Sequence, residues 1–440
     1  MRPLSYWHDS LAPGDDLAPR APLDGGAAGD VAVVGAGFTG LWTAYYLLRG
    51  DPALRVVVLE REVAGFGASG RNGGWCVGDQ GAPFGPLERD RGRDAVIAMV
   101  RELHHTVDEV GRVVEQEGID CGFAKGGALY AASNRAQLRR VHKRHAVHER
   151  YGLHDAYTVL GKQEAARIID ATGIEGGIFT PHAAALHPAR LARGLAVVVE
   201  RLGGVIHEQT TVRAIEPGRV RTDRGDVRAP IVVRATEAYT SSLDGHERTM
   251  LPLGNFMIAT EPIDDGVWEE IGLANRELFE DSATMLGYGQ RTADGRIAWG
   301  GLSAPSWWRS RVPPSPMHDP RTRKRLRDRL VSWFPVLRDV AITHDWGGVL
   351  GVPRDLRPGV GLDRATGMAW AGGYSGQGVA SANTAGRILR DLITETDSDL
   401  VHLPWVGHVS RPWEPEPLRW LGVHAVTSLA RVTDRLEYLR

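Results

Sequence analysis

The chain has 440 residues, of which 42% are hydrophobic and 24% charged, so the composition is that of a globular protein too long for one hydrophobic core. The formal net charge of −2 argues against a nucleic-acid binder, which needs a basic excess. Two cysteines, Cys76 and Cys121, are too few for a disulfide framework, and neither a signal-peptide core nor an apolar run of about 18 residues occurs, so we expect a cytoplasmic protein without a membrane span.

The first recognisable unit is a strand, a glycine turn, a helix and a second strand. Residues 1–29 are rich in Pro, Gly, Ala and Asp and predict a surface arm leading into this unit. The apolar run at 31–34 is typical of a parallel strand buried on both faces. A helix is expected at 41–48, and the run at 55–59 is the second strand, which ends at Glu60. The segment therefore predicts a βαβ unit.

The rest of the chain mixes helices with short strands. Apolar periodicity predicts helices at 93–118, 133–150, 188–202, about 320–336 and 379–393. Strands are expected within 121–132 and at 204–207, 211–215, 219–222, 231–235, 253–260, 285–290, 296–301 and 368–372. The tail ends in an amphipathic helix with an apolar side made of Leu418, Leu421, Ala425, Leu429, Val432 and Leu436, and we expect this side to dock on its own domain rather than to make a dimer or membrane contact.

This order of elements predicts an α/β fold with a discontinuous first domain and an inserted α+β second domain built on a mixed or antiparallel sheet. The first domain is expected to combine 30–84, 160–245 and 345–400, and the second to combine 85–159 and 246–344, with 1–29 as an arm and 401–440 as a tail.

The strongest local motif lies between the first strand and its helix. Gly35, Gly37 and Gly40 have the G-x-G-x-x-G spacing, in which the glycines allow a tight turn, close approach to a pyrophosphate and close helix–strand packing. The helix N-terminus then presents N–H groups to phosphates. Glu60 follows Gly40 by 20 residues and is placed to bind ribose hydroxyls. These features predict a dinucleotide site without separating FAD from NAD.

Two further glycine-rich loops favour FAD. The loop 65–74 can pass close to a second ring system, and its Ser69, Arg71 and Asn72 supply donors. The loop 372–378 opens the last helix of the domain, whose N–H groups and dipole suit the negative charge of a reduced flavin. The alternative for the first loop is a long flexible turn, and the second loop, taken alone, is more typical of a tight structural turn.

Together these segments resemble the FAD-dependent D-amino acid oxidase superfamily, which includes glycine oxidase and sarcosine oxidase, and most of all its γ-glutamylputrescine oxidase branch. The resemblance is carried by 67–74 (GASGRNGG), 186–191 (LHPARL), 234–239 (RATEAY), 257–262 (MIATEP), 346–348 (WGG) and 372–378 (GGYSGQG). It implies a Rossmann-like FAD-binding domain beside a substrate domain. Glu237 departs from the usual Ala-Thr-Gly-Ala pattern, which puts the local backbone in question.

The resemblance also implies which residues contact FAD. Backbone at Val212 would meet the adenine, Ala235 and Thr236 would pass near the phosphates, and Gly376, Gln377 and Gly378 would face the isoalloxazine ring. The other contacts would come from Gly35, Gly37, Phe38, Thr39, Gly40, Glu60, Arg61, Ala68, Ser69, Arg71, Asn72, Gly73, Gly373 and Val379.

The resemblance implies oxidation of a C–N bond of a small amine or amino acid by hydride transfer to flavin N5, giving an imine and then an aldehyde or keto product, with hydrogen peroxide if oxygen is the acceptor. No obligatory side-chain base is expected. Residues 346–360 contain no cysteine, so FAD is expected to be noncovalent, and the stretch 295–300 lacks the lysine that activates oxygen in some relatives. Oxidase and dehydrogenase both stay open.

Substrate-side candidates are the aromatic residues Trp75, Tyr288, Trp308 and Tyr374, which could form an amine cage through cation–π contact. No metal site is predicted. Alternatives to an amine or amino acid oxidase are a biosynthetic flavin dehydrogenase or desaturase that uses an electron carrier, and a noncatalytic FAD-binding protein. The sequence selects neither the substrate nor the oligomeric state.

Overall fold

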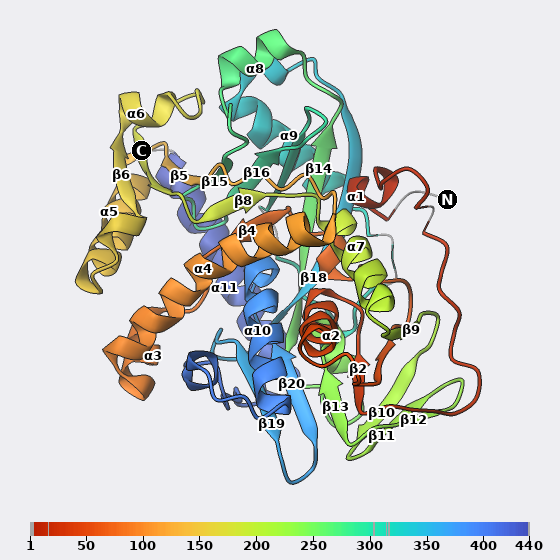
Figure 1. Cartoon of the computed structure of the whole chain (residues 1–440). Coiled ribbons are helices and arrows are strands. Elements are labelled where there is room, and N and C mark those ends of the chain that lie inside the picture. The colour runs from red at the N-terminus through yellow and green to blue at the C-terminus, as the bar shows by residue number, and fades with distance from the viewer. Residues whose placement is uncertain (1–3, 16, 302–303, 314, 316, 439–440) are drawn as a thin grey trace.

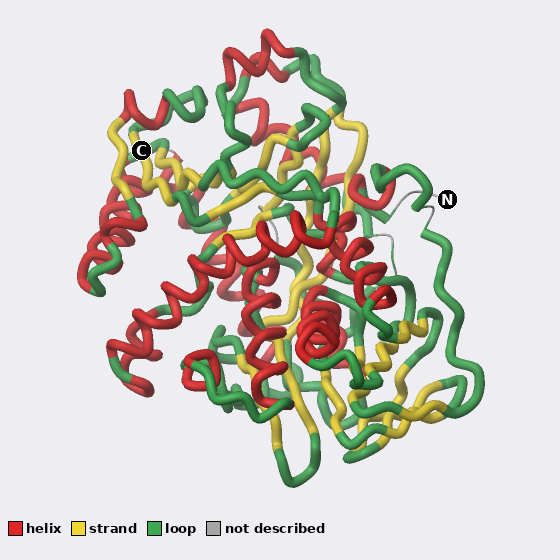
Figure 2. The backbone as a smooth tube through the Cα atoms, in the orientation of Figure 1, coloured by secondary structure: helices red, strands yellow, loops and turns green. Residues whose placement is uncertain are grey.

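A computed structural model describes residues 4–438 apart from 16, 302–303, 314 and 316. Its strands form an upper and a lower group with helices packed over them (Figures 1 and 2). The lower group contains a six-stranded sheet of order β19-β20-β13-β2-β3-β9, parallel except for the β19–β20 hairpin. Its strands are β19 (Gly359–Asp363), β20 (Met368–Gly372), β13 (Ile231–Arg234), β2 (Val31–Val34), β3 (Val56–Leu59) and β9 (Val205–His207).

Both faces of this sheet are buried, which explains why its central strands are uninterrupted apolar runs. Val31, Val33 and Val58 belong to the core under the helices, whereas the alternate residues Ala32 and Val34 meet a small second sheet. The helices are α2 (Phe38–Gly50), α4 (Arg93–Glu117), α7 (Pro188–Arg201) and α10 (Gly378–Ile393), and α2 packs against α10 (Figure 1). The small sheet consists of β1 (Ala27–Ala28), β12 (Asp226–Arg228), β11 (Arg219–Thr222) and β10 (Val212–Glu216).

The upper group is an eight-stranded mixed sheet of order β18-β14-β17-β16-β15-β5-β7-β6, antiparallel except between β15 and β5. Its strands are β18 (Ile342–Val352), β14 (Leu251–Thr260), β17 (Ile297–Gly301), β16 (Gly287–Arg291), β15 (Leu278–Asp281), β5 (Ala128–Ala132), β7 (Gly176–Thr180) and β6 (Thr158–Gly161). Helices α5 (Arg135–Arg150), α6 (Lys162–Ala166), α8 (Asp265–Ile271) and α9 (Pro320–Trp333) belong to this half. A two-stranded ribbon of β4 (Trp75–Val77) and β8 (Ala183–Ala185) completes the strands, and α3 (Phe84–Arg91) precedes α4.

The α/β architecture with a discontinuous first domain agrees with the expectation, but the domain boundaries differ. Within 158–180, β7 pairs with β5 and β6 pairs with β7, so this segment belongs to the upper sheet and the expected return to the first domain at residue 160 is wrong. Helix α4, expected in the substrate domain, instead buries Met99, Leu103 and Val107 in the core of the six-stranded sheet. Strand β18 keeps the chain in the upper sheet to Val352, beyond the expected boundary at 345.

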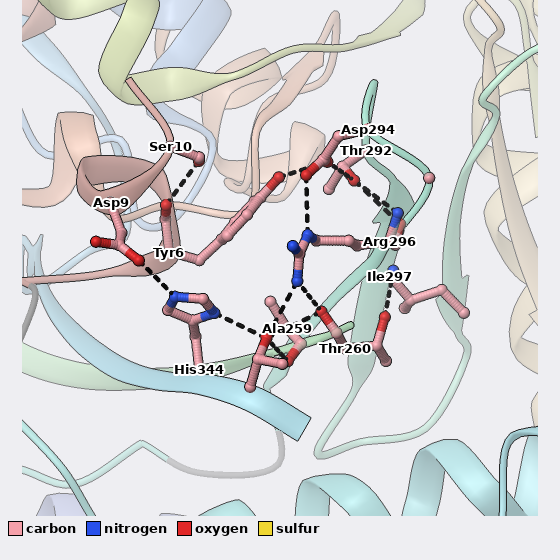
Figure 3. Close-up of polar contacts among 12 residues, drawn as sticks. Tyr6, Asp9, Ser10, Ala259, Thr260, Thr292, Asp294, Arg296, Ile297 and His344 are labelled. Carbon is pink, nitrogen blue, oxygen red and sulfur yellow. Dashed lines mark hydrogen bonds and ion pairs between the residues drawn. The ribbon is translucent and has the colours of Figure 1, made fainter. Parts of the chain in front are cut away.

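The N-terminal arm was expected to lie on the surface, but part of it is buried. Helix α1 (Tyr6–Asp9) buries Tyr6 and Trp7 to 3% and 1% exposure, against Trp346 of β18. Tyr6 Oη donates to Asp294 at 2.5 Å, and the imidazole of His344 lies 3.0 Å from a carboxylate oxygen of Asp9 (Figure 3). Trp7 Nε1 donates to the carbonyl of Asn72 at 2.8 Å. The arm therefore fastens the glycine-rich loop 65–74 to the upper sheet.

We expect Trp7→Phe to lower the free energy of unfolding by about 1–2 kcal/mol, because the Asn72 carbonyl loses its donor and the smaller ring underfills the site. Urea titration measures the change. Trp308→Phe is the matched control: Trp308 is 48% exposed, and a surface substitution changes stability by about 0.5 kcal/mol or less. Equal losses in the two variants would show that Trp7 does not anchor the loop.

The C-terminal helix α11 (Leu418–Tyr438) docks through the face opposite to the one expected. Arg140 donates to both carboxylate oxygens of Glu437 at 2.7 Å, and Asp434 accepts from the backbone N–H groups of Thr284 and Met285 at 2.8 and 2.6 Å. The predicted apolar side is exposed, at 62% for Leu418 and 68% for Leu429. Polar anchors thus determine the docked face. No helix in the described part of the chain is long and apolar enough to cross a membrane.

Candidate functional site

The three motif glycines lie where β2 turns into α2, and steric contacts explain each of them. Gly35 has a φ of +107°, and a Cβ there would lie 2.7 Å from the carbonyl oxygen of Ala235. A Cβ at Gly37 would come within 2.9 Å of Ser69 Oγ, and one at Gly40 within 1.9 Å of the Gly35 carbonyl oxygen. Helix α2 begins at Phe38, whose N–H donates to Ser69 Oγ, so the next N–H groups and the helix dipole face the space beyond the turn.

Glu60 lies at the carboxyl end of β3, beside this turn. Its Oε2 accepts from Ala36 N–H at 2.9 Å and its Oε1 from Glu62 N–H at 3.0 Å, which fixes the carboxylate. Burial raises its pKa, and the two N–H donors oppose that rise. The carboxylate lines a cavity together with Val212 of β10, the arrangement expected for ribose beside adenine.

The loop 65–74 is held mainly by its own side chains. Ser69 Oγ accepts from Phe38 N–H at 2.8 Å, at the start of α2. Asn72 donates to the carbonyls of Ala68 and Ser69 and accepts from Gly74 N–H. Arg71 donates from Nε to the Phe66 carbonyl at 2.6 Å and from Nη1 to Ser315 Oγ at 2.6 Å and the Gly347 carbonyl at 3.3 Å. The donors that the sequence suggested for a ligand are thus largely used to build the loop.

Glu237, which interrupts the family pattern, fastens the third glycine-rich loop. Its backbone has a φ of +44°, in the left-handed region. Its Oε1 accepts from the N–H groups of Gly373 and Tyr374 at 3.1 and 3.2 Å, just before α10 begins. Burial raises the pKa of Glu237 to about 7, and hydrogen bonds from Tyr374 and Gly373 and the charge of Arg234 oppose that rise. The Glu237 carboxyl group therefore connects the segment after β13 to the loop that precedes α10 through these hydrogen bonds.

Two adjoining cavities connect these segments. The first, of about 380 Å³, lies at the carboxyl ends of β2 and β3, and the second, of about 290 Å³, lies between the start of α10 and the upper sheet. They share the lining residues Phe38, Thr39, Ala68, Ser69, Glu237 and Val349, so they form one extended slot.

Most sequence-predicted cofactor residues line this slot. The first cavity is lined by Gly35, Gly37, Phe38, Thr39, Glu60, Arg61, Ala68, Ser69, Val212, Ala235 and Thr236. The second is lined by Arg71, Asn72, Gly73, Gly376, Gln377, Gly378 and Val379 in addition to the shared residues. Gly40 and Gly373 lie behind the lining, Gly40 in the close helix–strand contact and Gly373 as a donor to Glu237.

Three of the four aromatic substrate candidates come together at the second cavity. Trp75 and Tyr288 meet edge to face at 5.6 Å between ring centroids, and the Tyr374 hydroxyl lies 3.0 Å from Thr39 Oγ1. Trp308 does not join them, because it is half exposed and packs against Trp420 of α11. Asn255, Met257, Glu280 and Leu286 also line this cavity. Sequence reasoning assigned none of the four to the site, although Met257 lies in the segment 257–262 that carries the resemblance.

A slot with a phosphate-binding turn at one end and a second glycine-rich loop before α10 at the other defines a dinucleotide-binding protein with room for an additional ligand. The cradle closed by Gly35 and Gly37 and the fixed carboxylate of Glu60 fit the adenylate half of FAD, and the start of α10 fits the flavin half.

The chain belongs to the FAD dependent oxidoreductase family (DAO), whose sequence model matches residues 30–392, and FAD is its cofactor. It is 29% identical to γ-glutamylputrescine oxidoreductase of Escherichia coli over 409 residues, which is 90% of this chain and 92% of that one. It is 28% identical to the probable oxidoreductase OrdL of Haemophilus influenzae over 90% of this chain and 89% of that one. Glycine oxidase of Geobacillus kaustophilus shares the fold with a TM-score of 0.70 at 20% identity, over 87% of this chain and 100% of that one.

Proposed function

We propose that this oxidoreductase oxidises the C–N bond of a small amine or amino acid, giving an imine that water converts to an aldehyde or keto product. The observation that carries the proposal is the second cavity, in which the aromatic rings of Trp75, Tyr288 and Tyr374 face the residues that would hold the flavin. Bound FAD supplies the two-electron acceptor. The E. coli relative, named a γ-glutamylputrescine oxidoreductase, supports an amine as the substrate.

The chain's own residues would bind and orient the amine. Asn255 Nδ2 donates to Tyr288 Oη at 2.7 Å, which leaves Asn255 Oδ1 buried and without a hydrogen-bond partner among the described residues. A buried acceptor without a donor is costly, and an N–H of a neutral substrate amine would satisfy it. The rings of Trp75 and Tyr288 would exclude water beside it.

Anaerobic mixing of the FAD-loaded protein with a panel of amines and amino acids tests this function. We expect at least one panel member to bleach the visible flavin absorbance, and an oxygen electrode with a peroxide assay then identifies the acceptor. Prompt peroxide release supports an oxidase. Slow reoxidation in air supports an electron carrier. A flavin that no panel member reduces would contradict a catalytic role.

A further inference from the structure

Glu280 is an acidic residue of the second cavity that neither the cofactor nor the loops use. It lies on β15, opposite Tyr288 of β16 and opposite Tyr130 of β5 in the strand register. Side chains at opposed positions of neighbouring strands point to the same face of a sheet. The next residue, Asp281, points to the other face and pairs with Arg329 of α9. Glu280 therefore stands between two tyrosines on the cavity side.

Aromatic rings surround this carboxylate. Trp75 packs edge to face against Tyr130 at 6.4 Å and against Tyr288 at 5.6 Å between centroids. The three rings come from β4, β5 and β16 and meet beside Glu280 on β15. Aromatic faces and a carboxylate are the groups that bind an organic cation in proteins. The side chains thus have the composition of a cation subsite.

The Glu280 carboxyl group has no hydrogen-bonding or ion-pair partner within the described part of the protein. The nearest cation, Arg144 of α5, stacks over Tyr130 at 3.8 Å and forms its ion pair with Asp79. Burial raises the pKa of Glu280 to about 8, Arg144 lowers it, and Asp281 and Asp79 raise it further. At that pKa the carboxyl group keeps its proton near neutral pH in the empty cavity, and a cation bound beside it would lower the pKa and favour the ionised form.

The same cavity offers little to a substrate carboxylate. Its one arginine, Arg71, directs Nε and Nη1 to the oxygens of Phe66, Ser315 and Gly347, which leaves only Nη2 without a hydrogen-bond partner among the described residues, and the cavity lining contains no lysine. The cavity therefore favours a substrate whose polar end is positive over a simple amino acid.

We propose that Glu280, with Trp75 and Tyr288, binds a second, positively charged group of the substrate, so that the enzyme prefers diamines and related dications. The proposal rests on the proposed amine oxidation. A carboxylate holds an ammonium group in its charged form, whereas the amine that loses its α-hydrogen must be neutral. The group at Glu280 is therefore the distal cation, and the neutral amine lies elsewhere in the same cavity.

Binding of a fixed charge tests the subsite without turnover. Calorimetric titration of the FAD-loaded protein with choline, and with the isostere in which a tert-butyl group replaces the trimethylammonium group, compares a cation with a neutral ligand of equal shape. We expect the protein to prefer choline and Glu280→Gln to bind it about tenfold to hundredfold more weakly, with little change for the isostere. Glu269→Gln, which removes an exposed carboxylate on α8, should behave like the parent. An unchanged preference in Glu280→Gln would overturn the subsite.

Flavin reduction distinguishes this proposal from the broader one. We expect a linear diamine to reduce the flavin at lower concentration than the monoamine of equal length, and Glu280→Gln to remove that advantage by raising KM for the diamine alone. Glu280→Asp, which keeps the charge, should restore part of it. Equal use of both amines by the parent protein would overturn the dication preference while leaving amine oxidation intact. If neither amine reduces the flavin, amine oxidation fails, and the choline titration still decides the subsite.

Discussion

Gly40→Ala is expected to weaken FAD binding by about hundredfold or more. The new Cβ would lie 1.9 Å from the Gly35 carbonyl oxygen and 3.1 Å from Val33 Cγ1, so the turn that approaches the pyrophosphate has to move. Overpacking of this kind costs about 3 kcal/mol when backbone must shift, and about 1.4 kcal/mol is a factor of ten in affinity. Flavin fluorescence during titration of the apoprotein with FAD measures the loss.

The same helix supplies a matched control. Gly50 ends α2, and a Cβ there would meet only the side chain of Arg390, with Cδ at 3.7 Å and Nη1 at 4.0 Å, which are ordinary van der Waals distances. Alanine is the better helix former, so Gly50→Ala should bind FAD like the parent and be no less stable. If Gly40→Ala also bound FAD with the parent affinity, the glycine turn would not contact the dinucleotide.

The cofactor half of the site could be predicted from the sequence because its signals are local. Gly35, Gly37 and Glu60 lie within one βαβ unit. The ends of its two strands, the turn and the start of the helix fix the positions of these residues within a short stretch of chain. The loop before α10 joins them because β20 pairs with β13, beside β2. The short apolar runs of β2, β13 and β20 were sufficient to indicate that these strands belong to one buried sheet.

The substrate half could not be predicted in this way, because it depends on strand register between distant segments. Glu280 meets Tyr130 through a parallel pairing of β15 with β5, about a third of the chain away. The strand itself was missed, since Glu and Asp are depleted in strands and occupy half of 278–281. The position of Trp308 also depends on tertiary contacts, because it packs against Trp420 of α11 and does not line the cavity.

The helix α11 shows a different limit of sequence reasoning. Its apolar stripe was identified correctly, but periodicity does not say which side of a helix meets the protein. The docked side is set by Arg140, which binds Glu437, and by backbone N–H groups that bind Asp434. Those partners lie on α5 and in the loop after β15, and no local sequence pattern there predicts a contact with α11.

Glu237→Gln is expected to remove a pH dependence of stability that amounts to about 3 kcal/mol. The pKa of Glu237 is raised from its ordinary 4.5 to about 7, chiefly by burial, so the folded protein keeps this proton at pH values where the unfolded chain has lost it. The protonated group stabilises the fold most below 4.5, and the contribution falls as pH rises to about 7 and is constant above. Each pKa unit corresponds to about 1.4 kcal/mol.

Urea titrations of FAD-loaded parent and variant, at pH values from about 4.5 to about 8 and constant excess FAD, measure the difference between their unfolding free energies. Other titrations cancel in that difference, and Arg234, the cation beside Glu237, stays charged throughout because its pKa is lowered only to about 10. The parent should therefore lose about 3 kcal/mol relative to Glu237→Gln as pH rises, whereas Glu269→Gln should run parallel to the parent. Parallel curves for Glu237→Gln would mean that the carboxyl group is ionised at all these pH values, with its charge compensated by the N–H groups of Gly373 and Tyr374.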